Sequence, residues 1–117
     1  MKKVLTLVLT LTLCLPFTSA FANGKWEAVG EDKFKVRSKI IKSGGGDFKI
    51  CLVSGPSGYY TLYEDDSFKD DEIGTKTLSK GKCAVFRNIN RYLEGNRAEL
   101  YLKKNPNSGI AHVKFYD

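Results

Sequence analysis

The chain has 117 residues, 42% of them hydrophobic and 27% charged, and its formal net charge is +6. This length is typical of one small domain with a modest core. The single histidine excludes histidine-rich metal sites, and no serine stands in a G-x-S-x-G elbow, so serine hydrolysis has no support.

The first 22 residues have the three parts of a secretory signal. Residues 2–3 give a basic start, Val4 to Phe17 form the apolar run, and residues 20–22 provide the small-x-small exit. The apolar run is shorter than the roughly 20 residues of a membrane-spanning helix, and nothing later is comparably apolar. We expect cleavage after Ala22. Residues 23–117 should then form one β-sandwich domain without a transmembrane segment. The chain should be a bacterial protein that is secreted to the outside or to the periplasm.

Export places the remaining cysteines, Cys51 and Cys83, in an oxidising compartment. We predict one disulfide between them, which closes a loop of about 33 residues and contributes roughly 3 to 4 kcal/mol of stability. A redox pair is the alternative, but it normally has a close C-x-x-C spacing. A lipid anchor at Cys14 is the alternative to cleavage, although Leu13 stands where such a site needs a small side chain.

Residues 33–41, KFKVRSKII, alternate apolar and basic side chains and so predict one strand with a basic face. A stripe of cations attracts anionic polymers or lipid head groups. The alternative is an edge strand whose lysines prevent pairing with other chains. The predicted anionic-surface-binding residues are Lys33, Lys35, Arg37 and Lys39.

The next runs continue the strand pattern. FKICLVS, residues 48–54, is apolar on both faces and predicts a central strand, followed by a GPSG turn and a hairpin partner at YYTLYE. Near the end, RAELYLKK and GIAHVKFY predict a second hairpin, with Leu100 opposite Val113 and Tyr101 opposite His112. These runs have no helical period, so we predict an all-β fold: a small antiparallel β-sandwich of seven or eight strands with one disulfide.

The stretch YEDDSFKDDE, residues 63–72, concentrates six acids in a basic chain. Within LYEDDSFKDDEIG, a strand end is followed by Glu64 and Asp66, a short loop, Asp70 or Asp71, and then Ile-Gly. This pattern resembles the third calcium loop of the calcium- and phospholipid-binding β-sandwich domains of protein kinase C and synaptotagmin, which carry D-x-D, a loop and D-x-[IL]-G. Glu64 stands where that family usually has Asp.

The resemblance implies calcium as a cofactor and an eight-stranded sandwich. By the same resemblance, GGGDFKICL corresponds to the end of the first calcium loop. The predicted metal ligands are Asp47, Glu64, Asp66, Asp70 and Asp71. The open alternative is a solvated acidic turn that holds no ion.

Two functions from different classes follow. The first is a secreted, non-enzymatic protein that binds an anionic envelope polymer, lipid head groups or an extracellular partner, with calcium as the candidate cofactor. The second is a secreted antibacterial effector or an inhibitor of an exported enzyme, which acts by protein contact without metal. Nucleic acid is disfavoured as a partner of an exported protein. A small secreted nuclease that uses Glu99 and His112 is a third, weaker alternative to the non-enzymatic interpretation.

Overall fold

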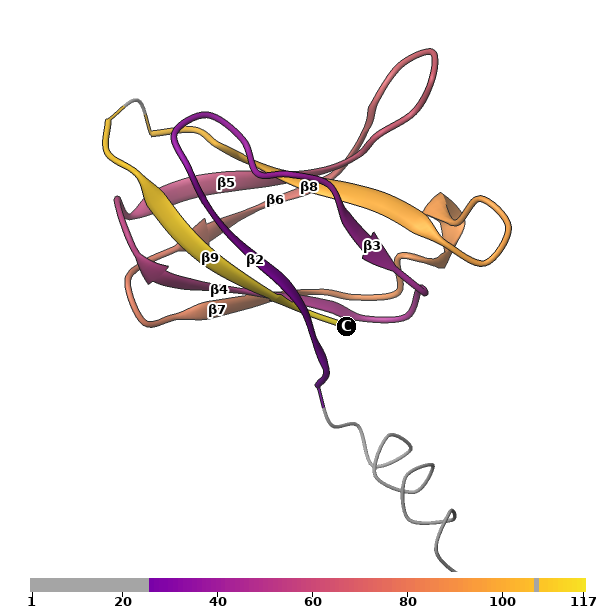
Figure 1. The fold of residues 1–117 in the computed structure, drawn as a ribbon, viewed down its shortest axis with the longest axis horizontal. Coiled ribbons are helices and arrows are strands. Elements are labelled where there is room, and N and C mark those ends of the chain that lie inside the picture. Colours follow the sequence, from indigo (N-terminus) through magenta and orange to yellow (C-terminus); the bar gives the residue numbers. More distant parts are fainter. Residues whose placement is uncertain (1–25, 107) are drawn as a thin grey trace, which may run out of the picture.

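The computed structural model describes residues 26–106 and 108–117, and they form two four-stranded antiparallel sheets packed face to face (Figure 1). The strand orders are β2-β9-β4-β7 and β3-β8-β5-β6. The elements are β2 (Ala28–Phe34), β3 (Ile41–Ser43), β4 (Phe48–Ser54), β5 (Gly58–Glu64), β6 (Asp71–Leu78), β7 (Cys83–Phe86), a 3₁₀ turn (Asn90–Tyr92), β8 (Ala98–Lys104) and β9 (Ala111–Tyr116).

The core lies between the two sheets and comes from alternate residues of their strands. In β4, Phe48, Ile50 and Leu52 are fully buried, and in β8 Leu100 and Leu102 face them from the other sheet. Alternation of this kind buries one face of each strand and leaves the other to solvent. The predicted antiparallel β-sandwich with one disulfide is therefore confirmed.

The prediction that the last two strands form a hairpin was wrong. Strand β8 pairs with β3 and β5, whereas β9 pairs with β2 and β4 in the opposite sheet. Leu100 and Val113 are both buried, but they lie in opposite sheets that face the same core and do not form a hydrogen-bonded pair. The hairpin predicted between β4 and β5 fails for the same reason, because these strands also belong to different sheets.

A single strand over residues 33–41 was also predicted and is not found. Strand β2 ends at Phe34, the chain bends at residues 35–36, and it crosses to the other sheet, where β3 begins at Ile41. Val36 and Ile40, which stand on the apolar side of the predicted strand, are 62% and 40% exposed. The crossover keeps the apolar-basic alternation without being one strand, so of the predicted basic face only Lys33 lies in a strand of a sheet.

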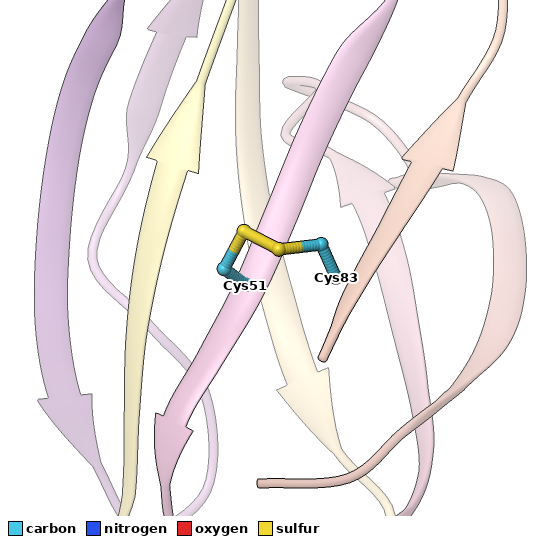
Figure 2. The surroundings of a disulfide bond; sticks show 2 residues. All are labelled: Cys51 and Cys83. Atoms are coloured by element: carbon cyan, nitrogen blue, oxygen red, sulfur yellow. A yellow bond between two sulfur atoms is a disulfide. The ribbon is translucent and has the colours of Figure 1, made fainter. Parts of the chain in front are cut away.

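The disulfide joins Cys51 and Cys83, which stand directly opposite each other on the neighbouring strands β4 and β7 (Figure 2). Their Cα atoms are 4.0 Å apart. Because Ile50 and Leu52 point into the core, the intervening Cys51 side chain lies on the outer face of the sheet. The bond therefore fastens the edge strand β7 to the sheet from outside the core.

No helix in the described part of the chain is long and apolar enough to cross a membrane. The predicted signal, residues 1–22, lies outside the described residues.

Candidate functional site

The acidic stretch forms the connection between β5 and β6, which projects beyond the end of the sandwich (Figure 1). Along β5, Tyr60, Leu62 and Glu64 alternate onto the buried face, so the strand delivers a carboxyl group to the rim of the core. Glu64 pairs with Asp71, the first residue of β6. A β-bulge between Leu62 and Tyr63 lies just before this pair, and bulges re-aim the side chains that follow them.

Three carboxylates converge here. Glu64, Asp66 and Asp71 each offer an oxygen atom, and these atoms all lie within 4.8 Å of one another. Glu64 is only 3% exposed, Asp66 is half-buried and Asp71 is exposed. The group can therefore present oxygen ligands from the core rim to the solvent, which is the donor type that calcium prefers.

Burial raises the pKa of Glu64 to about 7, and the nearby carboxylates of Glu94, Asp66 and Asp71 act in the same direction. Within residues 26–106 and 108–117, no ion pair joins Glu64 to a lysine, arginine or histidine. A buried carboxyl among other acids is stabilised either by holding a proton or by sharing a cation. Glu94 approaches from the turn after the 3₁₀ segment, and no spacing in the sequence links it to residue 64.

Asp70 was predicted as a metal ligand, but its oxygens are used differently. Its Oδ2 accepts a hydrogen bond from the Tyr101 hydroxyl at 2.6 Å, and its Oδ1 accepts one from the backbone N–H of Asp66 at 3.0 Å. These bonds, the Tyr101 bond foremost, lower the pKa of Asp70. Asp70 thus holds the loop that carries Asp66 and is not one of the three clustered acids.

The structure does not bring Asp47 to this cluster. Asp47 lies in the β3–β4 connection, where its Oδ1 accepts the backbone N–H of Asn88 at 2.8 Å. Its Oδ2 lies 3.2 Å from Nη1 of Arg87. The carboxylate therefore fastens the connection after β7, and the correspondence of residues 44–52 with a first calcium loop finds no support in this geometry.

The four predicted basic residues also separate. Lys33 lies in β2, opposite His112, on the outer face of one sheet. Lys35 and Arg37 lie on the crossover, where Arg37 forms an isolated bridge with Lys103 of β8. Lys39 follows, and its backbone N–H donates to Asp32 Oδ2 at 2.8 Å.

Arg37 is held above an aromatic pair that the sequence did not reveal. Its guanidinium carbon lies 4.8 Å from the ring centroid of Tyr101. Tyr63 stacks on Tyr101 with centroids 5.3 Å apart, and the two tyrosines are cross-strand partners in β5 and β8. Tyr101 thus contacts the basic crossover through its ring and the acidic loop through its hydroxyl.

The residues considered for a nuclease are not together. His112 Nε2 lies 2.8 Å from Glu31 Oε2 across β9 and β2, and this contact lowers the pKa of Glu31. Glu99 is an exposed residue of β8 in the opposite sheet. The expected proximity of His112 and Glu99 depended on the β8–β9 hairpin, which does not form.

Comparisons with known proteins give a family. The model of the family described as "YndA coiled coil domain" matches residues 23–115. A Bacillus subtilis (strain 168) protein described as "Uncharacterized protein YndA" is 34% identical over 101 residues, which cover 80% of this chain and 75% of the relative. No solved structure matches. The described residues contain strands and one 3₁₀ turn where the family description mentions a coiled coil. The chain belongs to the YndA family.

Proposed function

We propose that this chain is an exported, non-enzymatic protein that binds an anionic partner and holds Ca²⁺ at Glu64, Asp66 and Asp71. The observation that carries the proposal is the buried Glu64 carboxyl, which faces two further carboxylates within 4.8 Å and has no cationic partner in the described part of the chain. Export is supported by the family match, which starts at residue 23, next to the predicted cleavage site.

Calcium suits these residues better than a transition metal. The donors are carboxylate oxygens, without a histidine or thiolate, and such a set favours calcium or magnesium. Glu94, whose carboxyl lies near Glu64, is a further candidate ligand toward the six to eight oxygens that calcium takes. Glu64, on strand β5, supplies a fixed ligand, and the hydrogen bond from Asp66 N–H to Asp70 holds the loop that carries Asp66.

Thermal unfolding of the oxidised chain from residue 23, with millimolar Ca²⁺ or with chelator, tests the proposal. An ion present at a hundredfold excess over its Kd adds about 2.7 kcal/mol, and each kcal/mol raises the Tm of a domain this size by about 4 to 8 °C. We expect Asp66→Asn and Asp71→Asn to abolish this rise. Asp65→Asn, in the same loop but outside the cluster, should keep it.

Equal melting temperatures in calcium and chelator would reject the calcium site. A rise that Asp65→Asn removes as fully as Asp71→Asn would also reject it, because diffuse attraction to an acidic loop would then be the cause. Magnesium at the same concentration separates a calcium site from general charge screening.

A second candidate function is protein contact without metal, as an effector or inhibitor. It is favoured by Phe68, which is 99% exposed at the projecting β5–β6 loop (Figure 1). Exposed aromatic side chains of this kind commonly anchor protein interfaces. Partner binding that survives chelation and is lost in Phe68→Ser would favour this function over the first.

A further inference from the structure

A shallow groove lies over β8 and the crossover after β2. It consists of two neighbouring depressions of about 380 and 360 Å³, which share Val36 and Lys103 in their walls. The lining residues include the cations Lys35, Arg37 and Lys103. No ion pair neutralises these three side chains within residues 26–106 and 108–117.

The backbone fixes the positions of these cations. The Ser38 N–H donates to the Leu102 carbonyl at 2.8 Å, and the Lys104 N–H donates to the Val36 carbonyl at 2.9 Å. Arg37 and Lys103 are consequently cross-strand partners. A polyanion therefore meets cations that are already placed side by side, and their ordering costs less entropy on binding.

Arg37 is the most ordered of the three cations. Its guanidinium lies over the Tyr101 ring, 4.8 Å from the centroid, and the stack limits its side-chain freedom. A guanidinium carries five N–H donors, more than its contact with Tyr101 can use. Two of these donors can form paired hydrogen bonds to a phosphate.

We propose that this groove binds consecutive phosphodiester groups of an extended anionic polymer that carries no nucleobases. This specifies the anionic partner of the proposed function and rests on that function, but it does not depend on the calcium site. Nucleic acid is disfavoured because the two tyrosines that line the groove, Tyr63 and Tyr101, stack on each other, and Arg37 lies over Tyr101. A flat membrane is disfavoured because the cations line a recess.

One end of the groove is acidic, because it lies near the candidate calcium ligands Glu64, Asp66 and Asp71. Asp70 bonds to Tyr101, and the three clustered carboxylates belong to the same loop or its flanking strands. Their negative charge repels a polyanion that enters from this end. Calcium at the cluster would reduce the repulsion, so polymer affinity should rise with calcium without requiring it.

The test measures binding of lipid-free poly(glycerol phosphate) to the chain from residue 23 by calorimetry, in chelator and at low salt. Arg37→Gln with Lys103→Gln should raise the Kd by about a hundredfold, because each of the two lost charged hydrogen bonds contributes on the order of tenfold. In the same variant, the slope of log Kd against the logarithm of the salt concentration should be smaller by about 1.4. Arg37→Lys keeps the charge and should still weaken binding.

The matched control is Lys82→Gln with Lys114→Gln, which removes the same charge from strand β9 and the turn before β7, in the other sheet. We expect its Kd to stay within about twofold of the unmodified chain, since distant exposed charges are largely screened. Equal losses in the two double variants would overturn the groove but leave an anionic partner in place. Preference for single-stranded DNA or for phosphatidylglycerol vesicles over the polymer would also overturn it.

The calcium-dependent rise in Tm gives a separate readout for the proposed function. If Arg37→Gln with Lys103→Gln loses polymer binding but keeps the calcium-dependent rise in Tm, the groove is supported as an independent site. Absence of both polymer binding and a calcium response would reject the groove and the proposed function together.

Discussion

The Tyr101 hydroxyl donates a hydrogen bond to Asp70 Oδ2 at 2.6 Å and so joins the central strand β8 to the acidic loop. Burial and this bond raise the pKa of Tyr101, while the same bond lowers the pKa of Asp70. Because Arg37 stacks on the Tyr101 ring, one side chain positions both the candidate cation site and the basic groove. The two regions that the sequence presents separately are therefore in physical contact.

Replacement of Tyr101 by Phe tests this link. The ring and its stack with Tyr63 remain, but the bond to Asp70 is lost, and hydrogen bonds to charged groups contribute about 1.5 to 3 kcal/mol. We expect urea unfolding to show a loss of about 1 to 2 kcal/mol and the calcium midpoint to rise, because Asp66 is then held less firmly. Tyr59→Phe, at a 63% exposed tyrosine, should change neither quantity. If the midpoint of the calcium titration were unchanged in Tyr101→Phe, the bond from β8 to the acidic loop would not position the candidate calcium ligands.

Phe68 gives a contrasting prediction. This side chain is 99% exposed, so its replacement by Ser removes no buried contact. The free energy of unfolding should stay within about 0.5 kcal/mol of the unmodified chain, and the calcium-dependent rise in Tm should remain. Loss of the calcium response in Phe68→Ser, measured by the same thermal scans, would mean that the loop folds over the ion and buries the ring.

The disulfide should contribute a large share of the stability, although it lies outside the core. Ser replacements of both Cys51 and Cys83 restore the freedom of a loop of about 33 residues in the unfolded chain, which costs roughly 3 to 4 kcal/mol. Far-UV circular dichroism should stay native at low temperature, and the urea midpoint should fall. Reduction of the unmodified chain is the control and should reproduce the same fall. An unchanged midpoint would show that the unfolded chain is already compact around β4 and β7.

The sequence predicted the fold class and the cysteine pair because both depend on local or counted features. Period-two alternation and an even number of cysteines after the predicted signal leave few alternatives. Strand partners were not predictable in the same way. In a sandwich, Leu100 and Val113 face inward whether they pair by hydrogen bonds or meet across the core, so one pattern fits two arrangements.

Within the candidate site, only the residues that come from one continuous stretch of the sequence were predictable. Glu64, Asp66 and Asp71 are close in sequence and stay close in the structure. Tyr101 and Glu94 come from distant segments, and only the β5–β8 register and the turn before β8 bring them near. Asp47 was assigned by resemblance, but its carboxylate binds the Arg87–Asn88 segment.

Glu64 predicts an unusual pH dependence of stability. Its pKa is about 7 in the folded chain, against an ordinary value of 4.5, so the folded state binds more protons between these values. The contribution of Glu64 to the free energy of unfolding should therefore be most favourable below pH 4.5. It should fall by up to about 3 kcal/mol as the pH rises to 7. In chelator, Glu64→Gln should remove this slope and stabilise the chain at pH 8.

Calcium should oppose the loss of stability that Glu64 causes at higher pH, because an ion binds the carboxylate and not the protonated acid. In the unmodified chain the calcium-dependent rise in Tm should grow between pH 6 and pH 8, and in Glu64→Gln it should be absent at every pH. Glu99→Gln, at an exposed position of β8, is the matched control and should follow the unmodified chain. If Glu64→Gln destabilised the chain at pH 8 in chelator, the carboxylate would already have a favourable partner, and neither the proton nor calcium would be needed to stabilise it.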